Sequence, residues 1–431
     1  MISFLGSSLS PAVRSRLFFS YGYFLSLVLY IFSFYLIEYD FNLFLIVVVF
    51  FVGRILLSGR MDSVQIVFYL VAILLYVIPS IAIFYLRGID VSYIAAAFFV
   101  FTELLNFILK KFIFKSYKKR IYLASFQSRY GNDVFDCLFV VILSLVYFGG
   151  LIFPDKGFLS YLSFLFPFAL SLFLFERCLR HSNSIVKIWI YFFLICGSIL
   201  FYALFYWSGF GRLLIGAYIL LPVLLLNQYL DFGLRFWKIL TIVPFLLYFA
   251  QFTRYGTEIS VDQIFIGSAG HHLLVTHDLF TLSFVDFDQG LDRFFDQLKL
   301  FFLNWFPRDL WIDKPVGAGL SSVDDLYGRN GFGDEYSQSL GFVGEQIYLL
   351  GDLYIVGLLT LLLVIVLVYR FIFHMSAGYT VTTHIWTVSL ISFYWGGMAT
   401  FGSRVWFLLI PCLILSLLSA GATRSRETLK V

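Results

Sequence analysis

Long apolar stretches separated by short polar connections dominate the chain. A helix of about 20 apolar residues crosses the hydrocarbon core of a bilayer, and twelve stretches of roughly this length occur. They cover residues 17–37, 41–58, 64–86, 91–113, 134–153, 157–176, 187–207, 211–228, 237–252, 341–369, 384–402 and 404–420. The pattern predicts an all-α polytopic membrane protein with about 12 transmembrane helices.

One connection is far longer than the others. Residues 253–340 separate the first nine predicted transmembrane helices, in 1–252, from the last three and a tail, in 341–431. Within this loop, apolar residues from Leu291 to Trp305 recur at helical spacing among charged ones. They predict an amphipathic helix that lies at the membrane interface and contacts lipid. A helix that only packs the loop onto the bundle would have the same pattern.

Composition and charge agree with a membrane location and indicate an orientation. Hydrophobic residues make up 61% of the 431 residues and charged residues only 13%, which leaves too little polar surface for a water-soluble protein of this size. With the N-terminus inside, 20 of the 30 Lys and Arg residues fall on the cytoplasmic side. The loop 253–340 is then external. Basic cytoplasmic segments beside anionic lipid account for the net charge of +4, so we predict no nucleic acid partner.

Basic, aromatic and backbone-restricting residues crowd together in this loop between Asn304 and Gly319. Pro307 and Pro315 fix the backbone around Arg308 and Lys314, which places both cations on an irregular, stiffened segment. Such a segment can direct cationic donors towards a ligand. We therefore look for the functional site here.

Four arginines are predicted at the outer face: Arg212, Arg254, Arg308 and Arg404. Each guanidinium offers paired donors that match phosphate oxygens, so converging arginines would bind a diphosphate without a metal or another cofactor. Alternatively, each arginine at a helix end anchors that helix by reaching lipid headgroups. The four cysteines lie in or beside predicted spans, and no zinc-site spacing is present.

The tenth apolar stretch opens with polar residues. Glu345, Tyr348 and Asp352 are spaced to share one face of a continuous helix. Glu345 is a candidate acid or base there, with the alternative that it is a structural partner of an arginine. The loop histidines are other candidate bases: His271, His272 and His277.

These residues resemble a known family of membrane enzymes. The chain is similar, over about its C-terminal half, to the O-antigen polymerase (Wzy) family, which joins lipid-linked oligosaccharide repeats. The matching features are the aromatic-Pro-Arg to Lys-Pro run at 305–315, Gly211-Arg212, Gly344-Glu345 with Gly351, and Gly402-Ser403-Arg404. The Arg-ten residues-Gly spacing described in the family is present from Arg308 to Gly319 but absent after Arg254, where Phe265 stands.

The resemblance implies a fold similar to the C-type glycosyltransferases, with short helices in the periplasmic loop of a bacterial inner-membrane protein. It implies metal-independent polymerisation of undecaprenyl-diphosphate-linked oligosaccharide repeats, such as the O-antigen of lipopolysaccharide, at the periplasmic face. Arg308 and Glu345 would then be catalytic. Arg212, Arg254, Lys314, Tyr348 and Arg404 would bind substrate. A chain-length regulator protein is an expected partner.

Three other functions fit the same membrane plan. One is a structural scaffold for a secretion complex, in which alanine at Arg308 and Arg212 would leave function intact. An O-antigen ligase would transfer the finished polymer to another acceptor, and spacing does not reveal the acceptor. A lipid-linked oligosaccharide flippase or other transporter would instead place ionisable residues near the bilayer midplane. Here the mid-span regions are nearly free of charge and no repeat is evident, which favours an enzyme.

Overall fold

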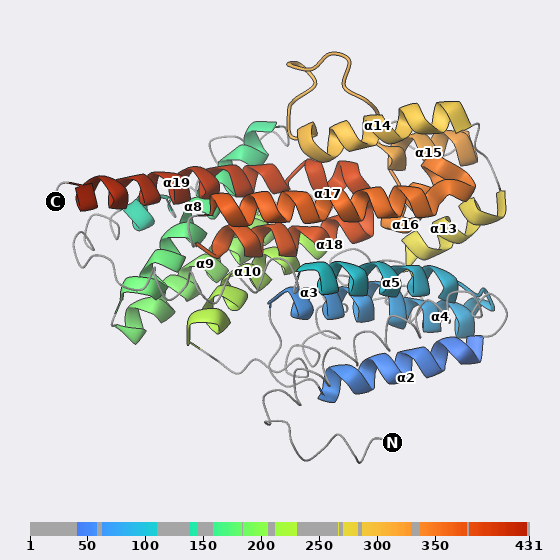
Figure 1. Cartoon of the computed structure of the whole chain (residues 1–431), viewed down its shortest axis with the longest axis horizontal. Coiled ribbons are helices and arrows are strands. Elements are labelled where there is room, and N and C mark those ends of the chain that lie inside the picture. The colour runs from blue at the N-terminus through green and yellow to red at the C-terminus, as the bar shows by residue number, and fades with distance from the viewer. Residues whose placement is uncertain are drawn as a thin grey trace.

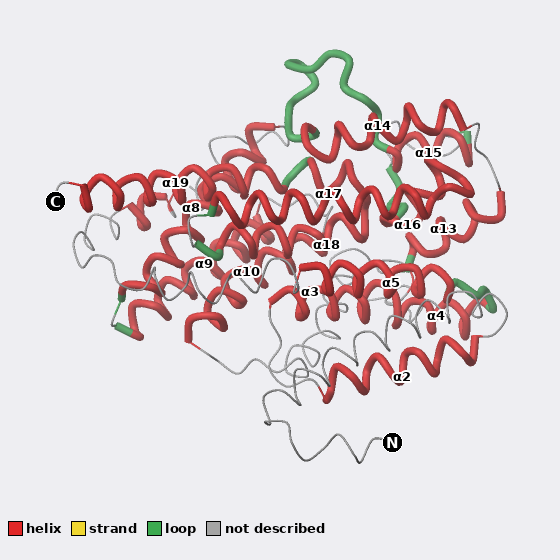
Figure 2. Tube along the Cα trace, viewed as in Figure 1, coloured by secondary structure: helices red, strands yellow, loops and turns green. Residues whose placement is uncertain are grey.

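The computed structural model describes residues 41–57, 63–109, 138–142, 144, 158–182, 184–205, 212–230, 266, 270–282, 287–328, 337–376 and 379–428. Within these residues every regular element is helical (Figures 1 and 2), which confirms the all-α prediction. The predicted stretches 17–37 and 237–252 lie outside the described residues, as does most of 134–153.

The described helices follow the apolar stretches closely. In the N-terminal part they are α2 (Phe41–Leu57), α3 (Ser63–Val71), the π-helix η2 (Ala72–Val77), α4 (Ile78–Arg87), α5 (Ser92–Leu109), α8 (Phe158–His181), α9 (Ile185–Phe205) and α10 (Arg212–Leu230). The long loop contributes α13 (His271–Leu282), α14 (Phe287–Leu303) and α15 (Ala318–Tyr327). The C-terminal part contains α16 (Gly341–Leu350), the 3-10 helix η5 (Gly351–Leu353), α17 (Tyr354–Met375), α18 (Val381–Gly402) and α19 (Val405–Thr428).

Several of these helices are long and apolar enough to cross a membrane. Four described segments meet that requirement: Val64–Arg87, Ser92–Leu109, Ile185–Tyr202 and Gly341–Met375. A fifth span is formed if α18 and α19, which bend by 77° at their junction, are counted as one. The described residues therefore have the character of a membrane protein. The total of 12 spans stays a prediction.

Two glycines break helices that the apolar pattern predicts to be continuous. Gly351, with φ 53°, ends α16, and the short helix η5 leads into α17. Gly397, with φ 79° and ψ −167°, interrupts α18 close to its C-terminal end. Both backbone conformations lie in the left-handed half of φ space, which glycine adopts more easily than other residues. Hydrophobicity alone does not reveal such breaks.

Helix α18 is at the centre of the described bundle. It packs against α10, α14, α16 and α19, and α17, α18 and α19 run side by side through the middle of Figure 1. Glycine allows one of these approaches to be very close, because a Cβ atom on Gly402 would collide with the carbonyl oxygens of Leu300 and Phe301 in α14. The long loop is thus packed onto the C-terminal helices through α14.

The predicted amphipathic helix is confirmed as α14. Phe294 and Phe301 are buried on its apolar side, whereas Asp292 and Lys299 are exposed. The apolar side contacts α16 and α18, so this helix packs the loop onto the bundle. Its predicted position at a lipid interface stays a prediction.

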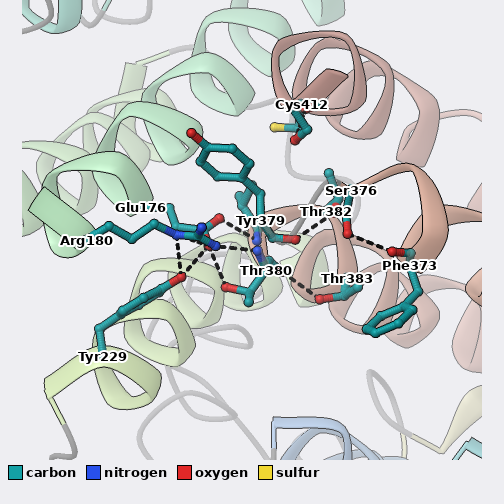
Figure 3. Close-up of polar contacts among 12 residues, drawn as sticks. Glu176, Arg180, Tyr229, Phe373, Ser376, Tyr379, Thr380, Thr382, Thr383 and Cys412 are labelled. Carbon is teal, nitrogen blue, oxygen red and sulfur yellow. Dashed lines mark hydrogen bonds and ion pairs between the residues drawn. The ribbon is translucent and has the colours of Figure 1, made fainter. Parts of the chain in front are cut away.

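The N-terminal end of α18 is held by a buried carboxylate (Figure 3). Glu176 of α8 accepts the backbone N–H groups of Thr380 and Val381 at 2.7 and 2.8 Å. Its Oε1 also forms an ion pair at 2.6 Å with Arg180. A carboxylate at a helix N-terminus satisfies unpaired donors and the helix dipole together. Tyr229 of α10 donates to the same oxygen, so α8, α10 and α18 meet in one polar cluster.

Candidate functional site

The segment that follows α14 folds back on itself through its two cations. Arg308 donates from Nη1 to the carbonyl oxygen of Lys314 at 2.9 Å and from Nη2 to that of Pro315 at 3.3 Å. The ammonium of Lys314 donates to the carbonyl oxygens of Asn304 and Phe306, each at 2.7 Å. The loop has no regular secondary structure, as Pro307 and Pro315 predict. Hydrogen bonds from the two cations to backbone carbonyl oxygens help to hold its shape instead.

The tip of this loop projects from the helices, between α14 and α15 at the top of Figure 1. Leu310 and Ile312 are 74% and 87% exposed there. Two large aliphatic side chains exposed to this extent and so close in sequence form a small apolar patch on the surface. The tip therefore offers an apolar edge beside the cations.

The loop is attached to the broken end of α18. The Asn304 side chain donates from Nδ2 to the carbonyl oxygen of Ala399 at 2.6 Å. The Trp406 indole donates to the carbonyl oxygen of Phe301 at 3.0 Å. These bonds join the last turn of α14 and the residue after it to both sides of the junction between α18 and α19.

A pocket of about 270 Å³ lies between the loop and this junction. Two cationic residues, Lys314 from the loop and Arg404 from the junction, line it together. The other lining residues are Asn304, Trp305, Phe306, Pro307, Ser403 and Phe407. The pocket thus combines two positive charges with hydroxyl and amide groups and with aromatic walls.

Lys314 is adapted to this place. Burial, and secondarily the nearby charge of Arg308, lowers the pKa of the Lys314 ammonium below its ordinary value. Two carbonyl oxygens accept its protons, and an ammonium has three N–H donors. A bound anion reduces the electrostatic repulsion between two neighbouring cations. The pocket is therefore suited to a negatively charged group.

The predicted arginines are only partly placed by the structure. Arg404 lines the pocket, whereas Arg308 lies beside it, exposed, with its guanidinium directed to the carbonyl oxygens of its own loop. The Arg212 side chain and the whole of Arg254 lie outside the described residues. Convergence of all four arginines thus stays a prediction. Of the predicted substrate-binding residues whose side chains the structure describes, Lys314 and Arg404 line one pocket together.

Glu345 lies away from the pocket lining, in the interior. Its side chain is 2% exposed, and Oε2 accepts the backbone N–H of Met398 at 2.8 Å. Within the described part of the chain, no arginine forms an ion pair with it. The break at Gly351 also corrects the prediction that Glu345, Tyr348 and Asp352 share one face of a continuous helix, because Asp352 falls in η5.

Tyr348 belongs to a different cluster. Its hydroxyl donates to Asp325 Oδ2 at 2.6 Å and accepts from Arg293 Nη1 at 3.3 Å. Arg293 and Asp325 also form a half-exposed ion pair at 3.0 Å. Tyr348 thus links α14, α15 and α16, and its predicted contact with substrate is untested.

The loop histidines are spread along α13. His272 is buried, and its ring packs edge-on against Tyr76. His277 Nδ1 lies 3.2 Å from the hydroxyl of Tyr93, and His271 is exposed. None of the three lines the described pocket. Among the described residues, no group of three His, Cys, Asp or Glu side chains is arranged to hold a metal ion.

Sequence reasoning missed several residues of this site. Asn304 and Ser403 stand inside the runs that drew attention to Arg308 and Arg404, but neither was singled out as a pocket residue. Phe407 carries no signal, because it is one of 55 phenylalanines. Its position in the first turn of α19 becomes informative only once the chain is folded.

Comparison of the chain with protein-family models, with curated proteins and with solved structures gave no match. The functional assignment therefore depends on the residues and geometry described above.

Proposed function

We propose that the chain is a membrane glycosyltransferase that polymerises undecaprenyl-diphosphate-linked oligosaccharide repeats at the outer face of the bacterial inner membrane. The observation that carries this proposal is the pocket in which Lys314 and Arg404 face one space with aromatic walls. Cations suit a diphosphate, and aromatic faces suit sugar rings or an apolar lipid chain.

The positions of the Glu176 cluster and of the pocket at opposite ends of α18 support an outer location for the pocket. The Glu176 cluster lies at the N-terminal end of α18, and the pocket lies beyond its C-terminal end. The distribution of basic residues predicts that 177–187 is cytoplasmic and that 253–340 is external. If α18 crosses the membrane, its N-terminal end lies on the cytoplasmic side and its C-terminal end on the external side, in agreement with both predictions. The apolar tip at Leu310 and Ile312 suits a substrate that arrives from the lipid.

In the proposed reaction, a hydroxyl oxygen of the acceptor repeat forms a bond to the anomeric carbon of the donor glycan. The bond from that carbon to the diphosphate oxygen breaks, and undecaprenyl diphosphate leaves with the bonding electrons. Lys314 and Arg404 stabilise the negative charge that grows on the leaving group, which is the kind of stabilisation that dominates many enzymatic barriers. Glu345 does not line the described pocket, so in this proposal the hydroxyl proton passes to water.

The test is incubation of the purified protein with synthetic undecaprenyl-diphosphate repeat units. We expect a ladder of dimers and longer products that carry one lipid diphosphate each. Lys314→Ala and Arg404→Ala should reduce the rate by roughly a hundredfold, since each removes a charge-assisted contact to the transition state. Lys299→Ala is the matched control, because Lys299 forms an exposed ion pair with Asp296 on the neighbouring helix α14.

Other outcomes would identify the alternatives. A product that forms only when a lipid A core acceptor is added would indicate a ligase. Transfer of intact repeats across proteoliposomes without a new glycosidic bond would indicate a transporter. Either result overturns the proposed polymerase.

A further inference from the structure

The break in α18 leaves two backbone groups without their helical partners. In a regular helix the N–H of Met398 would donate to the carbonyl oxygen of Tyr394. Here Glu345 Oε2 accepts that N–H at 2.8 Å, and the Tyr76 hydroxyl donates to that carbonyl oxygen at 3.0 Å. Both groups are buried, and an unpaired buried backbone group is costly. Glu345 and Tyr76 therefore stabilise the broken conformation of α18 specifically.

The fit between Glu345 and the break is close. A Cβ atom on Gly397 would lie 2.6 Å from Oε2 of Glu345, so the carboxylate occupies the space that any larger residue would need. Gly397 also has the positive φ of 79° that defines the break. The position of the Glu345 side chain and the backbone conformation at Gly397 thus depend on each other.

The break determines where the following residues go. Two residues after Gly397, the carbonyl oxygen of Ala399 accepts the Asn304 side chain and the backbone N–H of Ser403. The chain then turns at Ser403 and Arg404, and both residues line the pocket. If residues 398–402 continued the first part of α18 without a break, Arg404 would leave on a different path.

We propose that Glu345 is a positioning residue: by accepting the Met398 N–H at the break in α18, it fixes Arg404 on the wall of the pocket. This inference rests on the proposed function only in that the pocket receives a phosphate-bearing ligand. It differs from the general-base role predicted for Glu345, and the two roles require different properties of the side chain. A base needs an ionisable carboxyl group, whereas the positioning role needs an acceptor oxygen on a side chain of the right length.

The decisive comparison is between Glu345→Gln and Glu345→Ala, with inorganic pyrophosphate as the probe in calorimetric titration. Gln keeps an acceptor oxygen at the same distance, so its affinity should stay within about twofold of wild type. Ala leaves the Met398 N–H unpaired, and affinity should fall roughly five- to tenfold. In an Arg404→Ala background, Glu345→Ala should cause no further loss, because the two changes remove the same contact.

A ligand-independent measurement keeps the inference testable in every case. Ser403→Cys places a thiol on the pocket wall beside Arg404, and its rate of labelling by an anionic methanethiosulfonate reagent reports the local geometry and charge. Glu345→Ala should lower this rate severalfold, whereas Glu345→Gln should preserve it. The protein with Ser403 intact measures background labelling of the native cysteines, and thermal unfolding in detergent shows that each variant is folded.

The outcomes separate the two proposals. A Glu345→Gln variant that loses as much pyrophosphate affinity as Glu345→Ala would overturn the positioning role, because the retained acceptor oxygen should preserve binding. Equal losses of labelling in Gln and Ala variants would also overturn it. If the wild-type protein forms no oligosaccharide product, the polymerase proposal fails. The affinity and labelling comparisons then still decide the role of Glu345.

Discussion

The guanidinium of Arg308 donates to the carbonyl oxygen of Lys314 at 2.9 Å, while the ammonium of Lys314 donates across the loop to Asn304 and Phe306. One cation therefore fixes the backbone from which the other extends. Arg308 therefore has a structural role beside the pocket, whereas Lys314 lines the pocket and has direct access to a ligand bound there.

Arg308→Lys should weaken pyrophosphate binding, and Arg308→Ala should weaken it further. The planar guanidinium bonds two carbonyl oxygens at once, and an ammonium is a point charge that does not reproduce this geometry. We expect losses of roughly threefold for Lys and tenfold for Ala, measured by calorimetric titration. Arg293→Lys, in an exposed ion pair away from the pocket, is the control. Wild-type affinity in Arg308→Ala would show that the loop keeps its shape without the guanidinium.

Pyrophosphate binding should weaken in alkaline solution because Lys314 loses its proton. Burial and the charge of Arg308 lower the pKa of Lys314, so the loss of charge should begin at a lower pH than for an ordinary lysine, about 10.4. The affinity lost should be roughly tenfold, the contribution of one charged contact. In Lys314→Arg the guanidinium stays charged. Both affinities are measured from neutral pH upwards, and the ratio of the wild-type affinity to the Lys314→Arg affinity removes the effect of the ionisation of pyrophosphate itself. A ratio that stays constant with pH would contradict the prediction.

Gly397→Ala should destabilise the protein strongly. The new Cβ atom would meet the carboxylate of Glu345 at 2.6 Å, and alanine at φ 79° is strained by about 1–3 kcal/mol before that collision is counted. The midpoint of thermal unfolding in detergent should fall by several degrees. Gly216→Ala in α10 is the matched control, since no atom of another helix lies within 4 Å of the position that the new methyl group would take. Equal midpoints for the two variants would argue that α18 tolerates an unbroken helix.

Glu176→Ala should be among the most damaging single substitutions in the described chain. It leaves the largely buried Arg180 without its carboxylate and removes the acceptor for two backbone N–H groups. Loss of one member of a buried ion pair costs about 3–5 kcal/mol. The comparison is Asp296→Ala, which breaks an exposed ion pair with Lys299 and should cost under about 1 kcal/mol. Chemical unfolding of both variants measures the difference, and similar values would refute it.

The positions of the helices could be predicted from sequence because apolar runs report membrane-length helices directly. The apolar run at 64–86 shows this, since one segment spans Val64–Arg87 despite the internal π-helix. The amphipathic helix was equally visible, because α14 keeps a regular spacing of apolar residues. The breaks at Gly351 and Gly397 were not predicted, since only tertiary contacts decide which of 32 glycines adopts a positive φ.

The sequence predicted which loop lines the described pocket, but not the hydrogen bonds that its two cations form. The crowding of prolines and cations around Arg308 and Lys314 drew attention to this loop. Sequence could not show that the guanidinium of Arg308 faces backbone oxygens, because that depends on how the loop closes. The Glu176 cluster was missed as well. A single acidic residue at the end of an apolar stretch carries no sign of its partners in α10 and α18.

The separation between Glu176 and its backbone partners has a consequence for biosynthesis. Thr380 and Val381 follow this carboxylate by 204 and 205 residues, so α8 is synthesised long before the groups that satisfy it. Until then Arg180, one turn away in α8, is the counter-charge that pairs with it in the folded protein. Truncated chains that stop before α18 should therefore be recognised by quality-control proteases more readily than the full-length polypeptide.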